Sequence, residues 1–179
     1  MDAKEKLIII GLDCATPRTL FEDFINDCPN IKNLIEKGIY GKLKSSDPPI
    51  TIPAWMVMVT GKKAGTLGLY GFRHRKKNSY SDFWIASSYS IKEKKIWDLL
   101  GEYGISSCIV GVPPTYPVQP INGNMITGFI TPDASVNYTY PPELKKEIKE
   151  NIGDYIIDVN FRVNNKEALK DEIYEMTRI

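Results

Sequence analysis

Two side chains in this sequence have types and positions suited to phosphate chemistry. Asp13 directly follows the apolar run Leu7–Leu12, and Thr51 lies two residues before Pro53. We expect the run to form a strand covered on both faces, which delivers the carboxylate to the carboxyl edge of a parallel sheet. We expect Thr51 at the mouth of a helix, beside free N–H groups. A carboxylate that binds a divalent cation and a hydroxyl activated at a helix mouth are two parts of a metal-assisted phosphate-transfer site.

Each of these residues also has a purely structural interpretation. Asp is a favoured helix cap, so Asp13 is equally well explained as the cap of a helix that begins near Thr16. Threonine caps are frequent too, and Thr51 taken alone is more readily explained as one. Asp133 follows an expected strand, but Thr-Pro-Asp is ordinary turn chemistry, so it is not included among the predicted ligands. The residues by themselves leave the alternatives for Asp13 and Thr51 open.

The elements that must position these residues alternate between strands and helices. This alternation predicts an α/β fold with a mostly parallel sheet and helices on both faces, whose ligands bind beyond the carboxyl ends of the strands. The expected strands cover residues 7–12, 39–43, 83–86, 105–112, 125–130 and 155–159. The expected helices begin at Thr16-Pro17 and after Pro29, and cover residues 53–60, 95–103, 141–151 and 167–176.

Composition and charge argue against several classes of partner. The chain has 179 residues and a net charge of +1, so no field of the whole molecule draws it to nucleic acid or to an anionic membrane. Nucleic-acid binding calls for a broader basic face with aromatic residues between the charges. The cluster Arg73–Lys77 is therefore interpreted as a solvated loop, with steering of a phosphate-bearing substrate as the alternative. Three widely spaced cysteines and the short N-terminal apolar run favour a cytoplasmic protein without a signal peptide or membrane span.

The order of several short motifs resembles the type I phosphodiesterase/nucleotide pyrophosphatase family, which belongs to the alkaline phosphatase superfamily. The resemblance begins with Gly11–Pro17 and with Pro48–Trp55 followed by Thr60-Gly61. It extends over nearly all of the chain, through Gly65–Phe72, Ile96–Leu100, Val112–Pro117, Gly128–Pro132 and Tyr140–Leu144. No single motif is decisive, but their order and spacing together are specific.

This resemblance implies an alkaline-phosphatase-like α/β fold and a phosphoester hydrolase with two divalent metals, commonly zinc, with manganese as the other candidate. It implies that Thr51 is the nucleophile, which becomes phosphorylated and also contacts metal, and that Asp13 is a metal ligand. The substrate would be a small phosphoester. Residues 1–135 would form the nucleophile-bearing part of the domain, and residues 136–179 would continue it or begin an insertion.

The chain departs from the family pattern in its metal ligands. The family completes the two-metal site with further aspartates and several histidines, whereas this chain has one histidine, His74, which matches none of them. We therefore expect an amino-terminal portion of such an enzyme, with at most a partial metal site and little activity alone. The alternative is a non-catalytic α/β module that binds phosphate or metal. We also expect self-association, or a partner segment that supplies the missing ligands.

Overall fold

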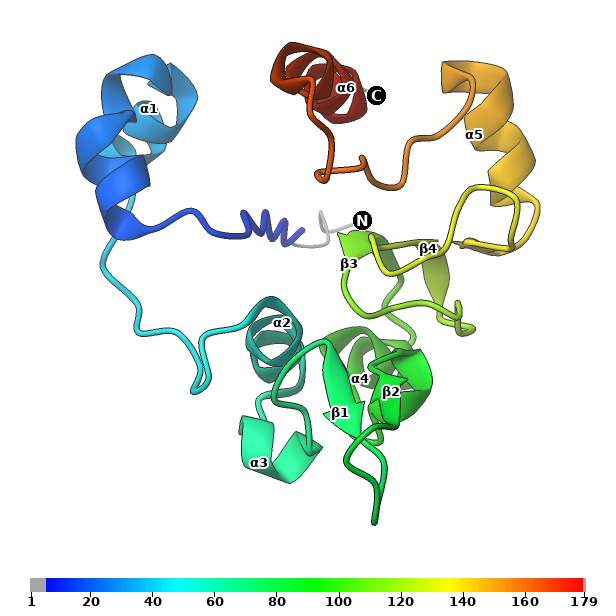
Figure 1. The fold of residues 1–179 in the computed structure, drawn as a ribbon. Helices are drawn as coiled ribbons and strands as arrows, with labels where there is room; N and C mark the ends of the chain where they lie inside the picture. The colour runs from blue at the N-terminus through cyan, green and yellow to red at the C-terminus, as the bar shows by residue number, and fades with distance from the viewer. Residues whose placement is uncertain (1–5, 179) are drawn as a thin grey trace. The chain divides into compact units, whose positions relative to one another are not determined.

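The computed structural model describes residues 6–178 and divides into two compact units, one ending at Lys44 and the other beginning at Ser45. Figure 1 shows the elements of each unit along the chain.

The first unit consists of short helical segments. A helical turn begins at Pro17, as predicted, and the Thr16 hydroxyl accepts a hydrogen bond from the Thr19 N–H at 3.2 Å, so Thr16 caps the turn. The turn continues as a π-helix over Thr19–Asp23 and a 3-10 helix over Ile25–Asp27. Helix α1 follows at Pro29–Lys37 and ends at Gly38, which confirms the second predicted helix.

The two strands predicted for the first unit are not formed. Residues 7–12 and 39–43 are irregular, and their apolar side chains are exposed; Ile8, for example, is 81% exposed. A strand needs a neighbour to accept its backbone hydrogen bonds, and within the described residues neither segment pairs with another. Asp13 therefore follows an irregular segment rather than a buried parallel strand, which corrects the prediction.

The second unit begins with two helices and a hairpin. Helix α2, Thr51–Thr60, ends at Gly61, whose φ of 65° is the left-handed conformation that glycine adopts without strain. A short helix α3, Ala64–Leu67, precedes strands β1, Arg73–Arg75, and β2, Phe83–Ile85. These two strands pair antiparallel, with His74 opposite Trp84.

A second sheet follows helix α4, which spans Ile96–Glu102. Its strands are β3, Ser107–Val112, β4, Gly123–Thr127, and β5, Thr139–Tyr140. Strands β3 and β4 are parallel, whereas β4 and β5 are antiparallel. The β3–β4 register shifts between Val110 and Val112, where Gly111 adopts a φ of 68°. Helices α5, Leu144–Ile152, and α6, Lys166–Arg178, complete the described chain.

The sheet content differs from the prediction. Of the three strand pairings in the described residues, only β3–β4 is parallel, so the mostly parallel sheet is not confirmed. Residues 155–159 are irregular rather than a strand. That segment pairs with no strand of the described chain, so no sheet completes its backbone hydrogen bonds. The result is a mixed α/β structure with small sheets and helices.

The core of the second unit gathers around helix α2. Its buried members come from four places in the sequence: Ile52, Met56, Leu69, Ala86 and Ile91. Ile52 and Met56 are four residues apart and lie on one helix face, and both are fully buried. Partly buried side chains from β2, from the end of β3 and from the 128–131 turn pack against them, including Trp84, Val112 and Ile130. The core therefore fixes helix α2, and with it Thr51, to the rest of the unit.

Candidate functional site

Thr51 is the first residue of helix α2 and its side chain does not cap the helix. The N-cap position is Ile50, in an extended conformation with φ −117° and ψ 145°, and no side chain caps this end. The first backbone bond of the helix runs from the Ala54 N–H to the Ile50 carbonyl at 3.0 Å. Pro53 has no N–H, so the N–H groups of Thr51 and Ile52 are the open donors of the first turn. The helix mouth thus presents two amides and a threonine hydroxyl.

The interpretation of Thr51 as a helix cap is therefore not supported by the geometry. Its hydroxyl makes no hydrogen bond with another described residue, and the side chain is half-buried rather than sealed in the core. Ile52, the next residue, is fully buried. Burial of Ile52 holds the backbone next to Thr51 in place, while the half-buried Thr51 side chain keeps its hydroxyl accessible. This arrangement suits a nucleophile beside an anion-binding helix end.

Asp13 is exposed in a tight turn of the first unit. Its Oδ1 atom accepts a hydrogen bond from the Cys14 N–H at 3.1 Å, and Cys14 has a φ of 60°. The Ala15 N–H donates to the Leu12 carbonyl at 3.3 Å, which closes the turn. Because Thr16 caps the following helical turn, Asp13 is not its cap. The carboxylate keeps most of its acceptor capacity, as a hard metal ligand requires.

The two predicted site residues lie in different units, and that they act on one cation remains a prediction. Within residues 6–178, no group of three or more His, Cys, Asp or Glu side chains is placed to hold a metal ion. Asp13 and Thr51 fit a divalent cation in the type of their oxygen donors, but two residues supply too few ligands for a two-metal site.

Other candidate residues have structural roles. The His74 ring stacks on Trp84 with centroids 4.2 Å apart and hydrogen-bonds the Gly71 carbonyl at 3.1 Å. Asp133 accepts hydrogen bonds from the Ser135 hydroxyl and N–H, which lower its pKa, as expected for turn chemistry. Cys14 is exposed. Trp55 packs against the core of the second unit.

Three buried threonines that sequence reasoning did not single out hold together the ends of β3 and β4. The Thr115 hydroxyl donates to the Val112 carbonyl at 2.6 Å and accepts the Gly128 N–H at 3.1 Å. The Thr131 hydroxyl donates to the Gly128 carbonyl at 2.6 Å, and Thr127 bonds to Thr131. All three hydroxyls have partners, unlike that of Thr51. The sequence feature that could have identified two of them is that Thr115 and Thr131 lie in the motifs Val112–Pro117 and Gly128–Pro132, at or just beyond the ends of expected strands.

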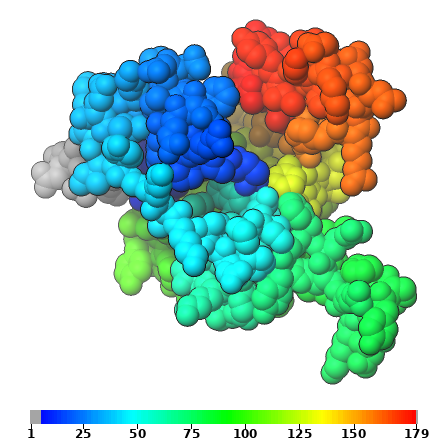
Figure 2. Space-filling view, turned by 60° about the vertical axis from the view of Figure 1, so that its left-hand side comes forward, coloured from blue at the N-terminus to red at the C-terminus, as the bar shows by residue number. Residues whose placement is uncertain are grey.

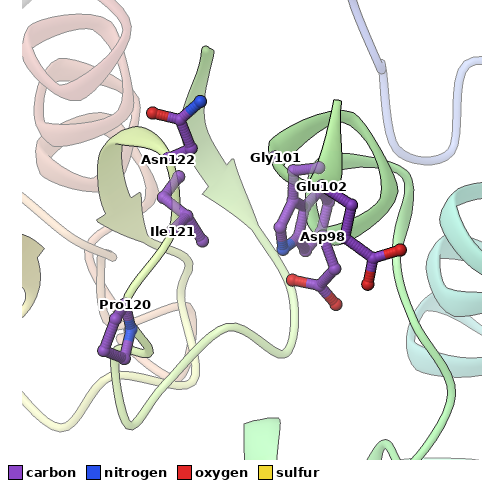
Figure 3. A pocket seen from close by; sticks show the side chains of 7 residues that line it. Asp98, Gly101, Glu102, Pro120, Ile121 and Asn122 are labelled. Atoms are coloured by element: carbon purple, nitrogen blue, oxygen red, sulfur yellow. The ribbon is translucent and has the colours of Figure 1, made fainter. Parts of the chain in front are cut away.

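A hollow of the second unit lies away from helix α2. It has a volume of about 390 Å³ and is formed by helix α4 and the segment before β4 (Figure 3). Asp98 and Glu102 on its rim already pair with Lys95 and Lys94, respectively. The hollow is lined by Trp97, Asp98, Gly101, Glu102, Pro120, Ile121 and Asn122. It includes neither Thr51 nor any other residue of helix α2, so it does not form part of the predicted site.

Comparison with known protein families shows which family this chain belongs to. The model of the type I phosphodiesterase/nucleotide pyrophosphatase family matches residues 7–178. The chain belongs to this family. The mixed α/β structure is compatible with the alkaline-phosphatase-like fold that the resemblance implies. Neither the search of curated proteins nor that of solved structures found a match.

Membership of the phosphodiesterase family indicates hydrolysis of phosphoesters as the type of reaction, and the family uses divalent metals. The matched region includes both Asp13 and Thr51. None of the helices described over residues 6–178 has the length and apolar character that crossing a bilayer requires.

Proposed function

We propose that this chain carries the nucleophile of a metal-dependent phosphoester hydrolase of the phosphodiesterase/nucleotide pyrophosphatase type. The observation that carries the proposal is the mouth of helix α2, where Thr51 presents an unengaged hydroxyl beside two open backbone amides. The family match adds the reaction type. The substrate is a small phosphoester.

The chemistry of the chain's own residues follows from this arrangement. The Thr51 oxygen attacks phosphorus, the bond from phosphorus to the leaving alcohol breaks, and the hydroxyl proton is lost to solvent or to a base. Water then attacks the phosphothreonine and releases phosphate or a phosphomonoester. The amides of Thr51 and Ile52 donate to a phosphoryl oxygen, where negative charge is concentrated.

Asp13 and Thr51 are the residues of this chain that would hold metal. A bound divalent ion, zinc or manganese, would lower the pKa of the hydroxyl and offset charge on the phosphoryl group. The exposed Asp13 carboxylate, with one hydrogen bond from Cys14, has oxygen lone pairs to donate. We propose that both residues contact the same cation, and that residues outside this sequence or on a partner chain supply the remaining ligands.

The organisation and location of the protein complete the proposal. Residues 1–135 carry the nucleophile-bearing part of the domain, and residues 136–179 continue it or start an insertion. The cysteines Cys14, Cys28 and Cys108 are free, which supports a reducing, cytoplasmic location. Exposed apolar residues such as Leu7, Ile8 and Ile10 support self-association through that segment. Sedimentation of the wild type and of Ile8→Ser tests this; monomers at every concentration would contradict it.

Turnover and covalent trapping test the nucleophile. The 179-residue chain is incubated with zinc or manganese and a chromogenic phosphodiester, then acid-quenched for mass spectrometry of the Thr51 peptide. We expect slow turnover and a phosphoryl adduct in the wild type, and neither in Thr51→Ala. Thr60→Ala is the matched control, because its hydroxyl bonds the Met56 carbonyl at the other end of the same helix. Equal turnover by wild type and Thr51→Ala at the background rate would refute catalysis through Thr51 and would favour the alternative, a non-catalytic module that binds phosphate or metal.

Metal binding tests whether Asp13 and Thr51 act together. Zinc affinity is measured by calorimetry for the wild type, Asp13→Asn, Thr51→Ala and the double variant. Residues that share a cation give non-additive losses, whereas independent sites give losses that add. Additive losses would refute the shared site without relying on activity.

A further inference from the structure

The hairpin formed by β1 and β2 presents a basic and aromatic surface that the hydrolase chemistry does not use. Its connecting loop, residues 76–82, projects from the second unit in both Figure 1 and Figure 2. Antiparallel register places Arg73 opposite Ile85 and Arg75 opposite Phe83. Since directly opposed residues share a sheet face, these four side chains lie on one face and are all exposed. His74 and Trp84 occupy the other face, where Trp84 packs on the core.

On the exposed face, guanidinium groups and aromatic rings interleave. The Arg75 guanidinium carbon lies 5.5 Å from the Tyr80 ring centroid and 5.9 Å from that of Phe83. That of Arg73 lies 5.7 Å from the Phe83 centroid. We call Arg73, Arg75, Tyr80 and Phe83 the basic–aromatic face. The sequence argues against nucleic acid because the chain is nearly neutral and shows no broad basic face with aromatic residues between the charges; the hairpin brings such aromatic residues and charges together locally.

The positively charged side chains of this hairpin make no ion pairs with residues 6–178. Arg73, Arg75, Lys76 and Lys77 are exposed and form no ion pair with a carboxylate of the described residues. Asp82 lies in the same loop and makes no ion pair with them either. The side chains thus offer charge and stacking surface together, which is the combination that single strands require.

We propose that the basic–aromatic face binds single-stranded nucleic acid, with the arginines on phosphates and Phe83 or Tyr80 stacking on an unpaired base. Tyr80 is 88% exposed and Phe83 is 45% exposed, so both have ring surface available. An anionic membrane fits less well, because the loop 76–82 carries no aliphatic side chain to enter the bilayer. Duplex DNA fits less well too, because its bases are already stacked and paired.

The proposal is tested by fluorescence anisotropy of a labelled single-stranded oligonucleotide with the full 179-residue chain, in a chelating buffer that prevents hydrolysis. We expect Phe83→Leu to raise the Kd about fivefold or more, through lost stacking. The double variant Arg73→Gln/Arg75→Gln should weaken binding about tenfold and reduce the slope of log K against log salt by about 1.4. Thr51→Ala should bind like the wild type, which separates this surface from the hydrolase site.

The control removes the same charge elsewhere. Lys146→Gln/Lys149→Gln loses two exposed cations of helix α5 and should leave the Kd unchanged. Arg73→Lys/Arg75→Lys keeps the charge and tests the need for a planar guanidinium. Circular dichroism confirms that each variant is folded.

Four results would overturn the proposal. These are no anisotropy change with wild type, an unchanged Kd in Phe83→Leu, equal weakening by the helix α5 control, and equal or tighter binding of duplex DNA or phosphatidylserine vesicles.

Discussion

The Thr127 hydroxyl lies 2.6 Å from the Thr131 hydroxyl, and both side chains are buried. Since Thr131 donates to the Gly128 carbonyl, Thr127 must be the donor in the pair. These two hydrogen bonds close the turn after β4. Thr115 holds the turn near the end of β3, because its hydroxyl accepts the Gly128 N–H and donates to the Val112 carbonyl. A threonine in such a network stabilises the fold, whereas the open hydroxyl of Thr51 is available for chemistry.

The buried hydroxyl network should be sensitive to removal of one member. Thr131→Val keeps the shape of the side chain but leaves the Thr127 hydroxyl without its acceptor, while the Gly128 carbonyl keeps only the Thr131 N–H at 3.0 Å. We expect the free energy of unfolding to fall by about 1–3 kcal/mol in urea denaturation. Thr177→Val is the control, because Thr177 bonds its own helix on an exposed surface. Equal losses in both variants would contradict the role of the network.

Gly128 should not tolerate a side chain. A Cβ atom at this position would lie 2.6 Å from the Gly111 carbonyl oxygen, closer than real contacts allow. We expect Gly128→Ala to destabilise the second unit by about 1–3 kcal/mol, through overpacking against backbone. Gly71→Ala provides the control, since nothing lies within 4 Å of its Cβ position. Thermal unfolding of both variants gives the comparison, and unchanged melting of Gly128→Ala would refute the close approach.

The packing of helix α2 should determine both stability and the placement of Thr51. Ile52 is fully buried, so Ile52→Ala leaves a cavity and should cost about 2–5 kcal/mol of unfolding free energy. Met58 on the same helix is 53% exposed, and Met58→Ala should change little. Urea denaturation measures both variants. Similar losses of unfolding free energy in Ile52→Ala and Met58→Ala would contradict the buried and exposed faces that the structure gives helix α2.

The tyrosine pair Tyr138–Tyr155 predicts a stability loss at alkaline pH. The rings stack with centroids 5.6 Å apart, and burial raises the pKa of both, with Tyr138 adding to the rise at Tyr155. Because the folded pKa exceeds the unfolded value of 10.0, the unfolded chain ionises first. Stability is thus complete below pH 10.0 and is lost as the pH rises through the folded pKa.

The measurement is the melting temperature as a function of pH across this window. Tyr155→Phe cannot ionise at that position, so its melting temperature should fall less steeply than that of the wild type above about pH 10. Tyr174→Phe is the matched control, because Tyr174 is 67% exposed. Identical pH profiles for wild type and Tyr155→Phe would contradict the raised pKa.

Local signals in the sequence predicted much of the second unit. Glycine at the end of a helix, a proline near its start and apolar residues four apart are local features, so helix α2 and its end at Gly61 followed directly from them. Strands β3 and β4 were predicted within two residues at each boundary except the late end of β4, which stops at Thr127 rather than residue 130. The helical starts at Thr16-Pro17 and near Pro29 were also confirmed.

The sequence by itself determined the family, through the order of its motifs, and the helix that presents Thr51. Only the tertiary structure decided which apolar runs become strands, because a strand requires a partner in space, and residues 7–12, 39–43 and 155–159 have none in the described chain. It also decided that Thr115, Thr127 and Thr131 are engaged while Thr51 is open, and that Arg75 meets Tyr80 and Phe83. The Thr115 hydroxyl accepts the Gly128 N–H from 13 residues away. The other contacts are closer in sequence, but they form only because the turns and the hairpin bring the side chains together, so residue types alone do not specify them.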